Sequence, residues 1–180
     1  MESLSIDKNE IQQTLDRLRC ERKWDERKNF LLRCIAEYPD EYYFFTLLSE
    51  ACYSQKLPEE TLAYAEKAMM LKGKEDDVWV NFYYGMALSL NDKYEEAIKQ
   101  FDIILRKHLS TIAYNEHGEG MKSAKGLAND ALYLKGRALM EMGDLRQAKK
   151  LIKKHLAHRQ HGIFSEFSKK DIERIAKSLE

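Results

Sequence analysis

One cluster of residues in the sequence has the types needed for acid–base chemistry. His117 lies beside Glu116 and two positions before Glu119. A histidine near carboxylates can exchange a proton close to neutral pH, so this cluster is the candidate for general acid–base catalysis. The sequence contains no phosphate-binding glycine loop, dinucleotide fingerprint, nucleophile elbow or metalloprotease motif. We therefore expect a protein without enzymatic activity and without a cofactor.

A second group of residues that could do chemistry is the histidine series His155, His158 and His161. On a helix, residues three apart drift by about 60° per step, so the first and third rings diverge. Metal-binding histidine pairs usually sit four residues apart with an acidic partner, and no such motif is present here. The histidines are therefore expected to lie on a solvated basic face and to hold no metal ion.

Basic residues are concentrated in the same region of the chain. Residues 129–180 hold twelve Lys and Arg against seven Asp and Glu, whereas the whole chain is balanced at thirty of each. Lys149, Lys150, Lys153, Lys154 and Arg159 could contact phosphates or an acidic surface. Binding to a nucleic acid or another anionic surface is thus the alternative function. Because no aromatic residues are interleaved and no nucleic-acid motif is present, a solvated face is the simpler interpretation.

The overall composition is that of a helical globular protein. Of 180 residues, 44% are hydrophobic, 33% are charged and only two are proline, so long stretches are free to form helix. The three cysteines, Cys20, Cys34 and Cys52, stand far apart and fit buried thiols in a reducing compartment. No signal-peptide core or membrane-length apolar run is present. We expect a cytoplasmic protein.

The helical pattern of the chain is clearest in residues 78–105. Val78–Leu90 reads as one amphipathic helix with Gly85 in its middle. Asn91-Asp92-Lys93 forms a polar turn, and the following helix places Ala97, Phe101 and Ile104 on one face. The small residues Gly85 and Ala97 stand where two packed helices would have to come close.

This helix pair resembles the tetratricopeptide repeat (TPR), a helix–turn–helix unit of about 34 residues. Gly85 and Ala97 match its small-residue positions, and the same register places repeats at about 8–41, 42–77, 78–128 and 129–162. Ser168 and Asp171 predict a capped final helix, 168–180, which can cover the last apolar face. The resemblance implies an all-α fold, a right-handed α-solenoid of about four TPR-like helix pairs with a C-terminal capping helix, in a single domain spanning 1–180.

The repeat spacing breaks once. Gly85 and Gly136 are fifty-one residues apart, and the extra residues lie at about 109–126. In a repeat array such an insert maps to a loop, often on the binding face, or to lengthened helices. We expect a longer second helix in repeat three, a glycine-containing turn and a longer first helix in repeat four, while a binding loop remains the other possibility.

The resemblance also implies a function and a site. TPR proteins use the first helices of their repeats to line a concave groove that binds a peptide or helix of a partner protein. The chain is therefore expected to act as a protein–protein interaction module, an adaptor or scaffold. The groove positions carry mainly aromatic residues, with Arg137 as the basic one, so a clamp for carboxylate tails is not expected. The partner-binding candidates are Tyr43, Glu50, Tyr53, Trp79, Phe82, Tyr83, Met86, Tyr133 and Arg137.

The competing interpretation is that several of these side chains belong to the core. Aromatic residues and methionine at helical spacing pack between helices as readily as they bind partners. On the groove hypothesis, changing Phe82 and Tyr83 to alanine abolishes partner binding and leaves the helical content unchanged.

Overall fold

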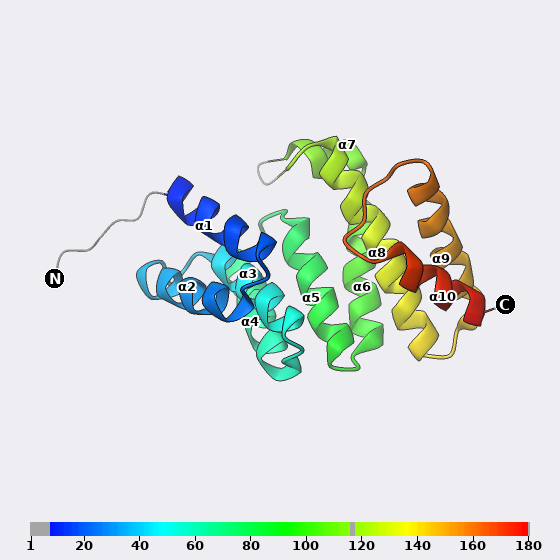
Figure 1. The fold of residues 1–180 in the computed structure, drawn as a ribbon, viewed down its shortest axis with the longest axis horizontal. Helices are drawn as coiled ribbons and strands as arrows, with labels where there is room; N and C mark the ends of the chain where they lie inside the picture. Colours follow the sequence, from blue (N-terminus) through cyan, green and yellow to red (C-terminus); the bar gives the residue numbers. More distant parts are fainter. Residues whose placement is uncertain (1–7, 116–117, 180) are drawn as a thin grey trace. The chain divides into compact units, whose positions relative to one another are not determined.

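The computed structural model describes residues 8–115 and 118–179 (Figure 1). Every regular element in this part of the chain is an α-helix, so the predicted all-α class is confirmed. None of these described helices is long and apolar enough to span a membrane. The helices are α1 (Lys8–Cys20), α2 (Trp24–Glu37), α3 (Tyr42–Ser54), α4 (Pro58–Lys72), α5 (Val78–Leu90), α6 (Tyr94–Leu105), α7 (Leu109–Tyr114), α8 (Met121–Glu141), α9 (Leu145–Gln160) and α10 (Lys169–Ser178).

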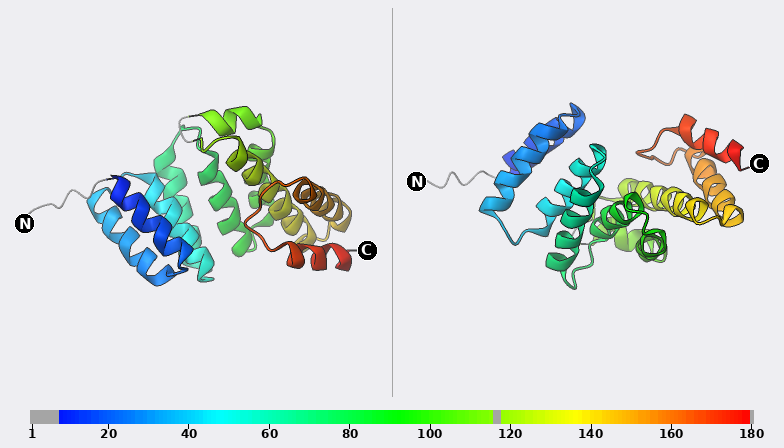
Figure 2. Two further views of the ribbon diagram at one scale, coloured as in Figure 1. Left: turned by 45° about the horizontal axis from the view of Figure 1, so that its top comes forward. Right: turned by 90° about the horizontal axis from the view of Figure 1, so that it is seen from below.

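The helices form four pairs, α1/α2, α3/α4, α5/α6 and α8/α9, in each of which a tight turn joins two antiparallel helices (Figure 2). The turns share one backbone geometry: their residues with positive φ are Arg22 (55°), Lys56 (58°), Asp92 (59°) and Gly143 (85°). In each pair, the next residue donates its N–H to a carbonyl five positions earlier, as Lys93 does to Leu88 at 2.9 Å and Asp144 to Leu139 at 2.9 Å. This is the Schellman helix ending. Its recurrence in all four pairs confirms a helical-repeat fold.

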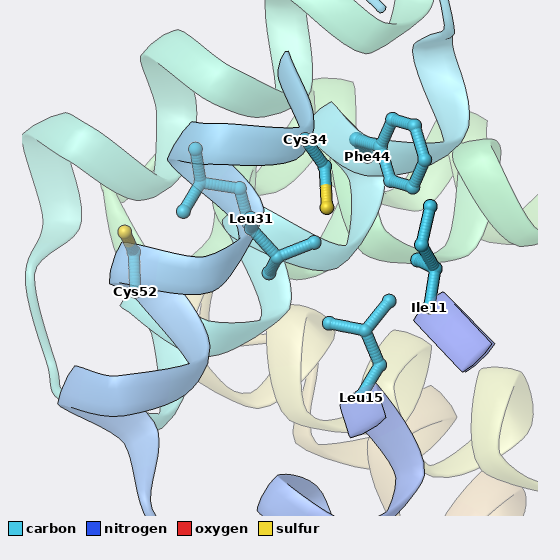
Figure 3. Packing of buried hydrophobic residues seen from close by; sticks show 7 residues of the cluster. Ile11, Leu15, Leu31, Cys34, Phe44 and Cys52 are labelled. Atoms are coloured by element: carbon cyan, nitrogen blue, oxygen red, sulfur yellow. The ribbon is translucent and has the colours of Figure 1, made fainter. Parts of the chain in front are cut away.

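The described residues group into two compact units, which divide between Leu71 and Lys72. Unit 1 is built from α1–α4. Its core draws on α1, α2 and α3: in Figure 3, Ile11 of α1 points toward Phe44 of α3, and Leu15 points toward Leu31 of α2. Cys52 of α3 is also part of this core. Apolar residues three and four apart on each helix thus meet in one interior, as the periodicity predicts.

Unit 2 is built from α5–α10, and its helix pairs pack closely at the predicted glycines. A Cβ atom on Gly85 would lie 2.6 Å from Cε1 of Phe101, and one on Gly136 would lie 3.0 Å from Cγ1 of Ile152. The contact at Gly85 is closer than a Cβ atom normally comes, and the contact at Gly136 is tighter than ordinary van der Waals packing, so glycine at each position allows a close approach of the two helices. The prediction that Gly85 sits at a close helix–helix approach is confirmed.

The insert between repeats three and four differs in part from expectation. The predicted lengthening of the second helix is wrong, because α6 ends at Leu105 and a separate short helix, α7, follows. The predicted lengthening of the next first helix is confirmed, because α8 begins at Met121 rather than Asn129. His108, the N-cap residue before α7, has extended backbone (φ −66°, ψ 136°), which separates α6 from α7.

Candidate functional site

Of the predicted binding residues in unit 1, Glu50 is the most buried. The side chain of Glu50 is nearly buried, and its Oε2 lies 2.7 Å from Nη1 of Arg27. Its Oε1 lies 3.0 Å from Nε of Arg19. Arg27 is only 2% exposed, so its charge depends on Glu50 for compensation. This predicted binding residue therefore joins α1, α2 and α3 inside unit 1.

The two tyrosines predicted in unit 1 stay at its surface. Tyr43 is 40% exposed and donates its hydroxyl hydrogen to Oε1 of Gln12 at 2.7 Å. Its ring also contacts Phe44 edge-on, with ring centroids 5.8 Å apart. Tyr53, near the end of α3, is half-buried. Both rings keep surface available for contact with another molecule.

In unit 2, α5 carries four of the predicted residues, and burial divides them into two pairs. Phe82 is 5% exposed and packs edge-on against Phe101 of α6, and Met86 is buried as well. Trp79 and Tyr83 are half-buried, and both rings contact Phe82 edge-on, with centroid distances of 6.4 Å and 5.6 Å. Phe82 and Met86 are therefore core residues of unit 2. Trp79 and Tyr83 lie at the surface, and their rings pack against the ring of Phe82.

Of the two predicted residues of α8, Tyr133 is covered by the chain itself. Tyr133 is buried, with its ring centroid 4.9 Å from that of Phe167 and 5.4 Å from that of His155. Arg137 is half-buried; it donates to the Tyr133 hydroxyl at 3.3 Å and lies 3.7 Å from the Glu141 carboxylate. Tyr133 thus belongs to the interior of unit 2.

The cover over Tyr133 is the segment 163–168 between α9 and α10, which crosses α8 in Figure 1. The backbone N–H of Glu166 donates to Oδ2 of Asp130 at 2.9 Å. Nη1 of Arg159 donates to the carbonyl of Phe167 at 2.5 Å. Sequence reasoning assigned the covering role to the C-terminal helix and missed this segment. The available signal was the pair of aromatic residues, Phe164 and Phe167, directly after the Gly162 helix stop.

Burial changes the ionisation of two groups beneath this segment. It raises the pKa of the Asp130 carboxyl to about 6, although the hydrogen bond from Glu166 favours the charged form. It lowers the pKa of His155, whose Nδ1–H donates to the Asn129 carbonyl at 2.9 Å. His155 fills a position where the repeat pattern has a small residue, so the imidazole is a buried structural side chain.

The three histidines predicted to share a solvated face differ in their surroundings. His155 is buried, His158 is half-buried with Nδ1 3.1 Å from Oδ1 of Asn129, and His161 is exposed. The prediction of a common solvated face is therefore wrong for His155. In the described residues, no group of three His, Cys, Asp or Glu side chains is placed to hold a metal ion. Of the acid–base candidates, Glu116 and His117 lie outside the described residues and Glu119 is exposed.

Comparison with known proteins supports the fourth predicted repeat directly. The family model of the tetratricopeptide repeat matches residues 130–154, which include the second half of α8 and more than the first half of α9. A search of curated proteins found no match. The match coincides with a helix pair whose turn geometry recurs in three other pairs. The chain is therefore a helical-repeat protein, and its fourth helix pair matches the tetratricopeptide repeat.

Proposed function

We propose that this protein is an adaptor that binds a peptide or helical segment of a partner protein through surface aromatic residues of its first helices. Tetratricopeptide repeats are in general protein–protein interaction modules. The finer proposal rests on one observation, the pair Trp79 and Tyr83 on α5. Both side chains are half-buried, stand four residues apart on one helix face, and rest on the buried ring of Phe82.

Such a pair suits recognition for a physical reason. Aromatic side chains bury a large area on binding and lose little conformational entropy, because their few torsions are already restrained. Here the ring contacts with Phe82 hold Trp79 and Tyr83 in place before a partner arrives. The chemistry required for this role is contact alone, so the proposal includes no catalytic step and no cofactor.

The test compares substitutions at the surface pair with one in the core. A partner is first captured from the native cell and identified, and its affinity is then measured with purified proteins. The double variant Trp79→Ala/Tyr83→Ala is expected to bind at least about tenfold more weakly, the loss typical of interface anchor residues, with an unchanged circular dichroism spectrum. Tyr114→Ala is the matched control, because Tyr114 is an exposed aromatic residue (71%) of the same unit.

Phe82 is unsuitable for this purpose, because substitution of a buried ring reports on stability as well as on binding. Unchanged affinity in the Trp79→Ala/Tyr83→Ala variant would overturn the proposal. The alternative, an anionic partner on the exposed Lys150, Lys153 and Lys154 of α9, predicts a different result. In that case the affinity falls steeply as salt rises to the physiological concentration, whereas aromatic contacts change little.

A further inference from the structure

Unit 2 contains a pocket of about 240 Å³ that none of the predicted binding residues lines. It lies among residues of α6, α7, α8 and α9 and the start of the segment that follows α9. Its buried wall is mainly apolar, with Ile104 and Leu132 as its least exposed apolar residues and Ile163 on the wall as well. Pockets for drug-sized ligands usually exceed about 300 Å³, so this pocket suits a smaller molecule or a single chain terminus.

The rim of the pocket is basic. Lys107, Lys125 and Lys154 all contribute to the lining, and no acidic side chain does so in the part of the chain that the structure describes. Lys107 is balanced by Asp76, whose Oδ1 lies 2.6 Å from its Nζ. The ion pairs of the described residues include neither Lys125 nor Lys154, and both are exposed. Two ammonium groups therefore stand uncompensated at the mouth of an apolar cavity, which favours a bound anion.

Asn129 adds an unused hydrogen-bond donor. This pocket-lining residue is 1% exposed, and its Nδ2 has no hydrogen-bond partner among the described residues. Nδ1 of His158 donates to Oδ1 of the same amide at 3.1 Å, which holds the amide with Nδ2 unpaired. A buried polar group without a partner is uncommon and is often explained by a ligand or water that completes it.

His158 itself responds to the surrounding charge. Burial, then the positive charges of Lys154 and His161, lower its pKa. The other titratable side chains in the lining are Lys107 and Lys125, which are also cationic. An anion bound in the pocket would stabilise the imidazolium form and raise the pKa of His158. The pKa of His158 therefore provides a local measurement of anion binding in the pocket.

From this arrangement we propose that the pocket binds a carboxylate carried on a short aliphatic stem, with the stem against Ile104 and Leu132 and the carboxylate near Lys125, Lys154 and Asn129. Among the described residues, the lining contains no Phe, Tyr or Trp ring on which a nucleobase could stack, and the volume is small for a nucleotide. The site is separate from Trp79 and Tyr83, so it does not depend on the proposed partner-binding surface.

The experiment is a titration of the full-length, ¹⁵N-labelled protein with hexanoate, followed by NMR. The backbone signals of Ala128 and Leu132 and the side-chain amide of Asn129 are expected to shift, with a dissociation constant on the order of 1 mM, as suits so few atoms. Hexanol has the aliphatic stem but no carboxylate, and inorganic phosphate is an anion without a stem. Neither is expected to cause a comparable shift. The pKa of His158, from its ring signals, is expected to rise in the presence of hexanoate.

A charge variant and its control complete the test. Lys125→Gln/Lys154→Gln is expected to weaken hexanoate binding at least about tenfold, whereas Lys150→Gln/Lys153→Gln, with the same charge change on exposed positions, leaves it unchanged. A second arm uses N-acetyl-alanyl-leucine and its C-terminal amide. Binding of hexanoate alone identifies a free acid as the natural source, and selective binding of the peptide acid identifies a chain terminus. Binding of neither, or equal binding of hexanol or phosphate, overturns the proposal.

Discussion

At the residue scale, the carboxylate of Glu50 compensates the buried charge of Arg27 in unit 1. It accepts from Arg27, which is almost fully buried, and from Arg19, which is partly exposed. Removing one member of a buried ion pair leaves the other charge without compensation, which costs roughly 3 kcal/mol or more. We therefore expect Glu50→Gln to lower the free energy of unfolding by roughly 3 kcal/mol in a urea titration.

The control for this substitution is the exposed pair in the same unit, in which Glu21 lies 3.0 Å from Lys23. Glu21→Gln removes an equal charge from a solvated side chain, and we expect no measurable change in the urea midpoint. Equal effects of the two substitutions would show that Glu50 is not desolvated in solution and would contradict the buried-pair interpretation.

A second residue-scale prediction concerns helix glycines. Gly85→Ala adds a methyl group 2.6 Å from the ring of Phe101, which has no exposed surface and cannot swing into solvent. Overpacking outweighs the gain in helix propensity, so the free energy of unfolding should fall by roughly 1–2 kcal/mol. In Gly126→Ala the added methyl group would lie 3.5 Å from the ring of Phe164, which is an ordinary contact. This substitution should therefore raise the free energy of unfolding by up to about 1 kcal/mol, measured for both variants by thermal or urea unfolding. A stabilising Gly85→Ala would show that α5 and α6 are farther apart in solution.

The success of sequence reasoning at this scale depended on what each residue type can signal. The close helix–helix packing at Gly85 could be predicted, because a glycine inside an amphipathic helix usually marks a place where another helix comes close. Glu50 was misassigned to a binding surface because its partner Arg27 occupies a small-residue position of another repeat, so the pattern gives no sign of the pair. The burial of Tyr133 depends on Phe167, thirty-four positions away, which no local periodicity records.

At the scale of elements, apolar periodicity and turn chemistry located the helix pairs, because both act within a few residues. The start of α5 at Val78 and the Ser168 cap of α10 coincide with prediction. The break between α6 and α7 was missed, since residues 106–108 contain neither glycine nor proline and the helix stops through backbone geometry at His108. Whether the four pairs continue as one right-handed solenoid stays a prediction.

The segment 163–168 has a titratable anchor in Asp130, which gives its docking a pH dependence. The pKa of this carboxyl is about 6 in the folded protein, against an ordinary value of 3.8. The folded state therefore binds the proton more tightly than the unfolded state does. Protonation of Asp130 stabilises the fold below about pH 4, and this contribution is lost as pH rises through about 6.

Asp130→Asn removes the charge and keeps an oxygen that can accept from the Glu166 N–H. We expect the stability of the variant relative to the native protein to increase between pH 4 and pH 7, by up to roughly 3 kcal/mol for a shift of two pKa units. Urea titrations at several pH values measure this difference, in which the opposing effect of His155 cancels. A pH-independent difference, or a ¹³C carboxyl titration with a midpoint near 4, would contradict the buried state of Asp130.

At the scale of the whole molecule, each of the two units has its own buried residues. The reactivity of the cysteine thiols measures how often the core of unit 1 opens, because all of the cysteines lie in that unit. All three cysteines belong to unit 1, with Cys20 exposed and Cys34 and Cys52 buried. Burial raises the pKa of Cys34 and raises that of Cys52 to about 11. Since the thiolate is the reactive form, at pH 8 only roughly one Cys52 in a thousand is ionised even where a reagent can reach it.

The native protein is therefore expected to show one fast-reacting thiol and two slow ones with a thiol-specific reagent. Cys20→Ser should abolish the fast phase and leave the slow reactions unchanged. Because Cys34 and Cys52 become accessible only when the core of unit 1 opens, Glu50→Gln should accelerate their labelling, by up to about a hundredfold for 3 kcal/mol when labelling follows the opening equilibrium. Three fast thiols in native buffer would show that this core is open in solution. Slow thiols that do not respond to Glu50→Gln would show that labelling proceeds through local opening of α2 or α3, without loss of the ion pair that joins them.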